Sequence, residues 1–271
     1  MVWYSYAKQL GRTTQILILW NIIIKVVWQA ALGYNKVMKI KVAIANFGTR
    51  QLEYTHKVIN EFNSFKTHSV DLNVYTTVPV DYNHKLYPES IGNSLPFSCR
   101  EDMAAAVNDY DLFVYNENDM LITEDNINAF IEHSKTVADG FVSGYIRYEF
   151  LNDVKILLDP NPHWGAITSN KTETSFEINN KHQGCWVLLQ KDFKAAINSG
   201  KFLCEPHHGP YGFLEQGASD PYTQCGLNKV FPLNYELCER LLIHHLPNKY
   251  IKYDEWLRSG ITLKTLFSSH I

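Results

Sequence analysis

Two carboxylates directly follow an apolar segment near the middle of the chain. Glu117 and Asp119 come after residues 111–116 and are two positions apart, so on an extended chain their side chains share a face. If 111–116 is a strand of an open α/β sheet, both acids lie at its carboxyl end, where such sheets bind ligands. Paired carboxylates suit Mg²⁺ or Mn²⁺ together with substrate phosphates. The spacing therefore predicts a divalent-cation site, and the alternative is two acids in an ordinary strand-to-helix loop.

The elements that must position these acids alternate between strand and helix patterns. This alternation predicts a mostly parallel central sheet flanked by helices, in a single α/β domain of residues 38–271. Strands are expected at 42–46, 70–76, 111–116, 140–149, 184–190 and 241–245, and helices at 52–62, 99–110, 124–137, 192–198 and from 220 toward 228. Thr123 and the Asp220-Pro221 pair are the expected helix starts that follow loops.

A longer motif leads into the two acids, since residues 95–119 are LPFSCREDMAAAVNDYDLFVYNEND. This segment resembles nucleotide-sugar-dependent glycosyltransferases of the GT-A fold, in which a helix with an early Arg precedes an apolar strand and a DxD-type metal motif. By this resemblance Glu117 and Asp119 stand at the DxD positions, with Glu replacing the first Asp, and Asp119 is the expected direct ligand. Arg100 stands where the family often places a basic residue near the donor diphosphate, and the alternative is a surface arginine.

The resemblance also implies roles for the C-terminal stretch 242–250. GT-A enzymes often complete the metal site with a histidine from near the chain end, and imidazole is an acceptable ligand for Mn²⁺ beside carboxylates. We expect His245 in this role, with His244 in reserve, because alternation along a strand points only one of them at the site. Lys249 would neutralise the pyrophosphate. The alternative is two histidines that end a core strand.

The catalytic base and the sugar-binding residues are implied in the same way. Asp220 stands at an expected helix start, where inverting members of the family place the base that deprotonates the acceptor hydroxyl. Glu215 is the alternative base, and Asp220 would otherwise only cap the helix. Gly184 would allow close approach of sugar and acceptor, and Trp186 would offer them a stacking face.

The loop after the first strand is the expected nucleotide contact. This fold places that loop against the base, which makes Thr49 and Arg50 candidates, and the alternative is a helix cap and a solvated arginine. A GxGxxG sequence is missing here, so a dinucleotide site of the Rossmann type is not expected.

Composition and cysteine usage exclude several classes of protein. The 271 residues, 45% hydrophobic and 20% charged, are typical of a folded globular protein. A net charge of −3 without a Lys/Arg-rich run argues against nucleic acid as a partner. Five widely spaced cysteines without a Cys-x-x-Cys pair form neither a disulfide scaffold nor a zinc ribbon. The segment from Cys204 to His208 is expected to be a loop, because no partner pair at ligand spacing follows it.

Residues 1–37 differ from the rest and form a hydrophobic leader. The stretch 16–32 is apolar except for Asn21, Lys25 and Gln29, which fall on one stripe of a helix. Three interpretations stay open: a signal anchor in the secretory pathway, an amphipathic helix on a membrane or on the domain, or a chain that starts at Met38 and is cytoplasmic. A signal anchor predicts membrane association, and so does an amphipathic helix that lies on a membrane.

Together these residues predict a metal-dependent glycosyltransferase, inverting if Asp220 is the base. Its partners would be a nucleotide-sugar donor and a carbohydrate or glycoconjugate acceptor, with Mn²⁺ or Mg²⁺ as cofactor. Two alternatives remain: a metal-dependent phosphohydrolase or nucleotidyltransferase that uses the same acids, and a non-catalytic domain that binds sugars or a protein.

Overall fold

The computed structural model describes residues 37–161, 168–252, 260–269 and 271. The predicted leader helix and its membrane contact through 16–32 lie outside the described residues. Within the described part of the chain, no helix is long and apolar enough to cross a membrane.

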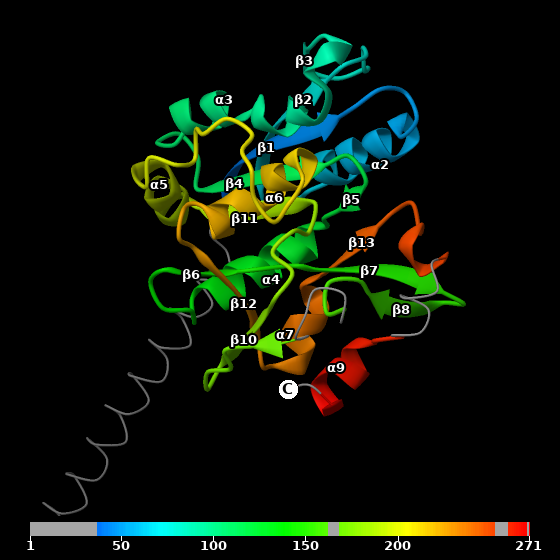
Figure 1. Ribbon diagram of the computed structural model, residues 1–271, viewed down its shortest axis with the longest axis vertical. Coiled ribbons are helices and arrows are strands. Elements are labelled where there is room, and N and C mark those ends of the chain that lie inside the picture. The colour runs from blue at the N-terminus through cyan, green and yellow to red at the C-terminus, as the bar shows by residue number, and fades with distance from the viewer. Residues whose placement is uncertain (1–36, 162–167, 253–259, 270) are drawn as a thin grey trace, which may run out of the picture. The chain divides into compact units, whose positions relative to one another are not determined.

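A five-stranded sheet forms the upper part of the view in Figure 1. Its strands pair in parallel except for the last one along the chain, which is antiparallel to its neighbour. The prediction of a mostly parallel central sheet is therefore confirmed for this sheet. In spatial order the strands are β11 (Cys185–Leu189), β4 (Leu112–Glu117), β1 (Lys39–Asn46), β2 (Ser69–Thr76) and β3 (His84–Leu86).

Alternate residues of these strands face two separate cores. Val42 of β1 and Val114 of β4 pack on one face against helices α2 (Leu52–Asn63) and α4 (Glu124–Ser134). Ala43 and Phe113 point to the opposite face, where α3 (Arg100–Ala105), α5 (Gln190–Asn198) and α6 (Phe213–Thr223) pack. The sheet is thus covered on both faces, and its carboxyl edge is left for ligands.

The structure also contains two smaller four-stranded sheets, which the sequence did not predict. One has the order β6-β12-β10-β9 and the other β5-β13-β7-β8. The expected strand at 140–149 divides between them at Gly144, where an added Cβ would lie 2.5 Å from the Lys229 side chain, so the chain turns in close contact. Their strands are β5 (Met120–Leu121), β6 (Phe141–Ser143), β7 (Ile146–Leu151), β8 (Val154–Leu157), β9 (Thr168–Ser169), β10 (Ser175–Ile178), β12 (Asn228–Pro232) and β13 (Leu242–His245).

Of the two helix starts predicted from capping residues, the structure confirms the one at Thr123 and not the one at Asp220. Thr123 caps α4 as predicted, with its Oγ1 accepting from the Asn126 amide. The predicted helix start at Asp220 is wrong, because α6 already begins at Phe213 and contains Pro221. Among the described residues, the remaining helical segments are the 3₁₀ helices η1 (Glu89–Phe97) and η3 (Tyr250–Lys252) and the α-helices α7 (Tyr235–Arg240) and α9 (Leu263–Ser269).

Pro221 is tolerated inside α6 because another group satisfies the carbonyl it leaves open. A proline cannot donate to the carbonyl four residues earlier, here that of Gly217. Trp186 Nε1 donates to this carbonyl at 3.2 Å, from β11. The tryptophan of the neighbouring sheet therefore replaces the hydrogen bond that the helix lacks at Pro221.

Candidate active site

The carboxyl end of β4 carries the two acids predicted to bind a cation. Ala45 of β1 pairs with Glu117 of β4, and Asn46 of β1 pairs with Thr76 of β2. Three parallel strands therefore end side by side. This is the edge at which an open α/β sheet binds its ligands.

Buried amide and hydroxyl groups hold the backbone at this edge. Asn118 Nδ2 donates to Asn46 Oδ1 at 2.7 Å and to Thr55 Oγ1 at 3.0 Å, and Asn46 Nδ2 donates to Thr76 Oγ1 at 2.9 Å. All four side chains are buried. Asn118 lies between the two acids in the sequence. Its buried hydrogen bonds therefore fix the backbone positions from which the Glu117 and Asp119 side chains extend. The sequence signal for this network is a polar residue at the end of each apolar strand.

His245 approaches Asp119 from the C-terminal part of the chain. Its Nε2 lies 3.4 Å from Asp119 Oδ2, and the same oxygen accepts a hydrogen bond from Gln51 Nε2 at 3.0 Å. His244 instead stacks on Tyr148. Alternation along β13 thus places His245, and not His244, against the acid, while Gln51 was not predicted.

Glu149 of β7 is a buried partner of His245 that the sequence analysis missed. Its Oε1 lies 2.5 Å from His245 Nδ1, and its two oxygens also accept the backbone amides of Lys249, Tyr250 and Ile251. One fully buried carboxylate therefore orients the imidazole and anchors the turn that carries Lys249. An acid between the aromatic residues of an apolar strand was the available signal.

The charges at this cluster shift one another's pKa values in opposite directions. Burial, together with the neighbouring charge of Asp119, raises the pKa of Glu117 to about 7. Burial also acts to raise the pKa of Asp119, but the hydrogen bond and charge of His245 outweigh it and lower that pKa. Burial alone would lower the pKa of His245, yet its bonds to Asp119 and Glu149 raise it. The two acids thus favour the charged form of the histidine, while burial and Asp119 favour the protonated form of Glu117.

A cavity of about 200 Å³ opens beside these groups. It brings Glu117 and Asp119 together with Gln51 and the exposed Lys249, while Phe47 and Leu214 add apolar contact area. Gly184 lies beside Glu117, since a Cβ there would come within 2.9 Å of Met120 and 3.4 Å of the Glu117 carboxylate. The close approach expected at Gly184 is therefore an approach to Glu117.

A divalent cation fits the donor set. Oε1 of Glu117 and Oδ1 of Asp119 are buried and have no hydrogen-bond partner, which is costly unless a cation satisfies them. His245 presents its Nδ1 to Glu149 and its Nε2 to Asp119, the orientation in which metal-binding histidines donate their second N–H to a carboxylate. Among the described residues, the donor atoms that already lie within 4.8 Å of one another belong to a different group, Cys204, His207 and Asp220. The three donors at the strand end do not all lie this close to one another. A cation at the strand end would therefore draw its donors closer together.

Arg100 and Asp220 do not lie at this cavity. They form a buried ion pair, with Arg100 Nη2 donating to Asp220 Oδ2 at 2.8 Å. Arg100 Nη1 also donates to the Phe202 carbonyl, and His207 Nε2 lies 3.1 Å from Asp220 Oδ1. Because both Asp220 oxygens are engaged and the side chain is fully buried, it is not free to take a proton from an acceptor. Arg100 is equally a core residue and not a surface contact for a diphosphate.

Trp186 is not a stacking platform for sugars. It is 1% exposed, lies within the second core and stacks against Tyr115 and Phe193. The apolar pattern of β11 already favoured burial, and the bond to the Gly217 carbonyl explains why a tryptophan stands there.

The remaining predicted residues lie at the surface. Thr49 and Arg50 are exposed in the loop between β1 and α2, next to Phe47 and Gln51 of the cavity. Glu215 lies in the first turn of α6, where its Oε2 accepts the Gly212 amide at 2.9 Å, adjacent to Leu214 of the cavity. All three residues therefore border the cavity through their neighbours along the chain.

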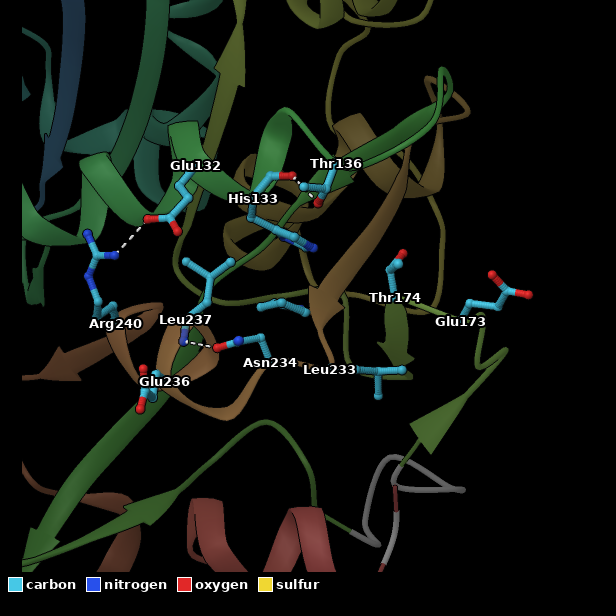
Figure 2. A pocket seen from close by; sticks show the side chains of 11 residues that line it. Glu132, His133, Thr136, Glu173, Thr174, Leu233, Asn234, Glu236, Leu237 and Arg240 are labelled. Carbon is cyan, nitrogen blue, oxygen red and sulfur yellow. Dashed lines mark hydrogen bonds and ion pairs between the residues drawn. The ribbon is translucent and has the colours of Figure 1, made fainter. Parts of the chain in front are cut away.

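A larger hollow, of about 620 Å³, lies elsewhere and holds none of the predicted site residues. Figure 2 shows its lining from α4, α7 and the end of β12, with Arg240 bonded to Glu132. His133 in its wall is held between Ser143 and Ser175, and burial lowers the pKa of this histidine to about 4. Glu132 and His133 of this hollow are thus already paired with neighbouring side chains.

Comparisons with known proteins leave the family open. No family model matches the chain, and no curated protein matches it. Among solved structures, it is similar to one described as a glycosyltransferase involved in the glycosylation of the major capsid of PBCV-1. That similarity has a TM-score of 0.37 and 10% identity, and it covers 78% of this chain and 99% of the other. At this level the likeness does not assign a function to the chain.

Removal of the Glu117 charge is expected to stabilise the metal-free chain above neutral pH. The folded state keeps the Glu117 proton up to about pH 7, whereas an unfolded glutamate loses it near about pH 4.3, so stability falls as the pH rises through this window. Glu117→Gln should therefore exceed the wild type in free energy of unfolding by roughly 1–2 kcal/mol at about pH 8, and by little at about pH 5. Urea unfolding in the presence of a chelator measures both values. A variant that is less stable at both pH values would contradict the pKa assignment.

Trp186→Phe is expected to weaken the fold. The change leaves the Gly217 carbonyl without its donor and opens space in the core, which together cost roughly 2–3 kcal/mol. Urea unfolding tests this, with the exposed Tyr235→Phe as the control. Unchanged stability would mean that Trp186 does not have the packing role described.

Proposed function

We propose that this chain transfers a sugar from a nucleoside-diphosphate donor to an acceptor hydroxyl, with Mn²⁺ or Mg²⁺ as cofactor. One observation carries the proposal: Glu117 and Asp119 line one cavity with Lys249 at the carboxyl end of a parallel strand, and each acid has a buried oxygen without a partner. His245 lies 3.4 Å from Asp119 at the same place. The resemblance of residues 95–119 to the GT-A glycosyltransferases supports the same reading. Four predicted site residues from two distant parts of the sequence, 117–119 and 245–249, come together there.

Glu117, Asp119 and His245 would hold the cation. When bound, it would supply Lewis-acid stabilisation of the charge that develops on the departing diphosphate. Lys249 is exposed at the cavity, and its position is set by the bond from its backbone amide to Glu149. An ammonium group held there adds a positive charge for the same phosphates. Thr49 and Arg50 would contact the nucleotide from the neighbouring loop.

Glu215 is the proposed base. In an inverting transfer, the acceptor O–H gives its proton to the carboxylate while its oxygen bonds to the anomeric carbon, and the bond from that carbon to the diphosphate oxygen breaks. Asp220, the other acid predicted for this step, is instead paired with Arg100 and His207 in the core. Glu215 is only partly buried and follows Leu214, which lines the cavity.

Membrane association through 16–32 stays a prediction, because those residues lie outside the described part of the chain. A location in the secretory pathway depends on that segment alone.

The central test uses the full chain with labelled nucleotide sugars and Mn²⁺. We expect transfer or slow release of sugar from at least one donor, and a loss of at least about 100-fold in Asp119→Ala, because the cation loses its main ligand. Glu236→Ala, an exposed acid of the larger hollow, is the matched control and should keep full activity.

The same assay separates the rival functions. Release of phosphate from plain nucleotides, lost in Asp119→Ala, would favour a phosphohydrolase or a nucleotidyltransferase. Failure of every donor to bind in calorimetry, with and without Mn²⁺, would overturn the proposal and favour a non-catalytic domain.

Glu215→Gln should lower turnover by about 10²–10⁴-fold and leave donor affinity within about twofold. Glutamine keeps an acceptor for the Gly212 amide, so α6 retains its N-terminal bond while the base is lost. Single-turnover transfer and donor calorimetry measure the two quantities. Wild-type turnover in this variant would exclude Glu215 as the base.

A further inference from the structure

A second group of metal-type donors lies where the loop that precedes α6 packs against that helix. Cys204, His207 and Asp220 each offer one donor atom, and these atoms all lie within 4.8 Å of one another. Two of the distances are 3.1 Å, from His207 Nε2 to Asp220 Oδ1, and 3.7 Å, from Cys204 Sγ to Asp220 Oδ2. The sequence shows only the first two residues as neighbours. The third comes from the interior of α6, a helix that was expected to start at Asp220 and instead begins at Phe213.

The donor types favour zinc. Thiolate, imidazole and carboxylate groups are the types of protein ligand that bind Zn²⁺, at metal–ligand distances of roughly 2.0–2.3 Å. The thiolate makes the group a poor site for Mg²⁺ or Mn²⁺, which prefer oxygen donors. Cys204 and His207 are separated by two residues, one of them Pro206, so a short and stiff segment presents both.

The surroundings hold the three donors in place without a metal. Gln216 of α6 is buried, accepts the His207 amide at 3.0 Å and donates to the carbonyl of His207. Arg100 occupies Asp220 Oδ2, which leaves Oδ1 on the side of His207. A second Arg100 nitrogen lies 3.6 Å from Cys204 Sγ. Bonds of this kind to ligating carboxylates and thiolates are usual around protein metal sites.

Charge and access agree with occupancy by a dication. The group carries one carboxylate and a thiol that ionises on binding, against one guanidinium. A bound Zn²⁺ therefore leaves a single excess positive charge, which an anionic fourth ligand or a hydroxide removes. Asp220 is fully buried, while Cys204 and His207 are partly exposed, so an ion reaches the donors from solvent.

We propose that Cys204, His207 and Asp220 bind Zn²⁺ and fasten the 204–212 loop to α6. The site is separate from the strand-end cluster and does not depend on the proposed transfer reaction. Because α6 carries Leu214 into the cavity, the bound ion stabilises one wall of that cavity.

Cobalt substitution of the full chain tests the site. Co²⁺ in a thiolate-containing tetrahedral site gives a sulfur-to-cobalt charge-transfer absorption, which oxygen-only sites lack. We expect one such ion per chain, displaced by Zn²⁺. Cys204→Ser should abolish the charge-transfer absorption and weaken Zn²⁺ binding at least about tenfold in a chelator competition. Cys225→Ser, a partly buried cysteine outside the group, should keep both.

Two further variants make the outcome decisive. His207→Gln removes a ligand from a partly exposed position, so it should fold and still bind Zn²⁺ at least about tenfold more weakly. Asp119→Ala should leave the absorption unchanged, which distinguishes this site from the strand-end cluster. Co²⁺ binding without charge-transfer absorption, or wild-type Zn²⁺ affinity in Cys204→Ser, would overturn the proposal.

Discussion

A histidine held between two buried carboxylates is the interaction on which the rest of the site depends. Asp119 comes from the end of β4, His245 from β13 and Glu149 from β7, so one chain of contacts joins the central sheet to a second sheet. Loss of any one member leaves a buried charge without its partner, which costs several kcal/mol. Glu149 also accepts hydrogen bonds from the backbone amides of residues 249–251, and these bonds fix the position of Lys249.

The same region is arranged at a cost to stability. Glu117 keeps a raised pKa because burial and Asp119 disfavour its charge, and the buried oxygens of both acids lack partners. A core selected for stability alone would not place two acids there. Natural proteins retain such unfavourable groups where a ligand completes them, which is why the strand end, and not the larger hollow, is the proposed active site.

The second polar centre has a different character. Arg100, Asp220 and His207 are paired around α6, and Trp186 completes that helix where Pro221 interrupts it. Charged and aromatic residues of this kind suggest a binding site when only their types are known. In the folded chain they hold a helix against the sheet, with Cys204 and His207 adding the donors of the proposed zinc site.

The sequence alone determined four strands of the central sheet, the helices on its first face and the acids at its edge, because these depend on the period of apolar residues within short segments. The short strand β3 was not predicted. It also identified His245 over His244, since alternation along a strand is a local rule. The positions of Arg100, Trp186 and Asp220, the partners Gln51 and Glu149, and the two smaller sheets were decided only by the tertiary structure. Burial and hydrogen-bond partners of a polar side chain depend on segments distant along the chain, and no local pattern records which of them meet it.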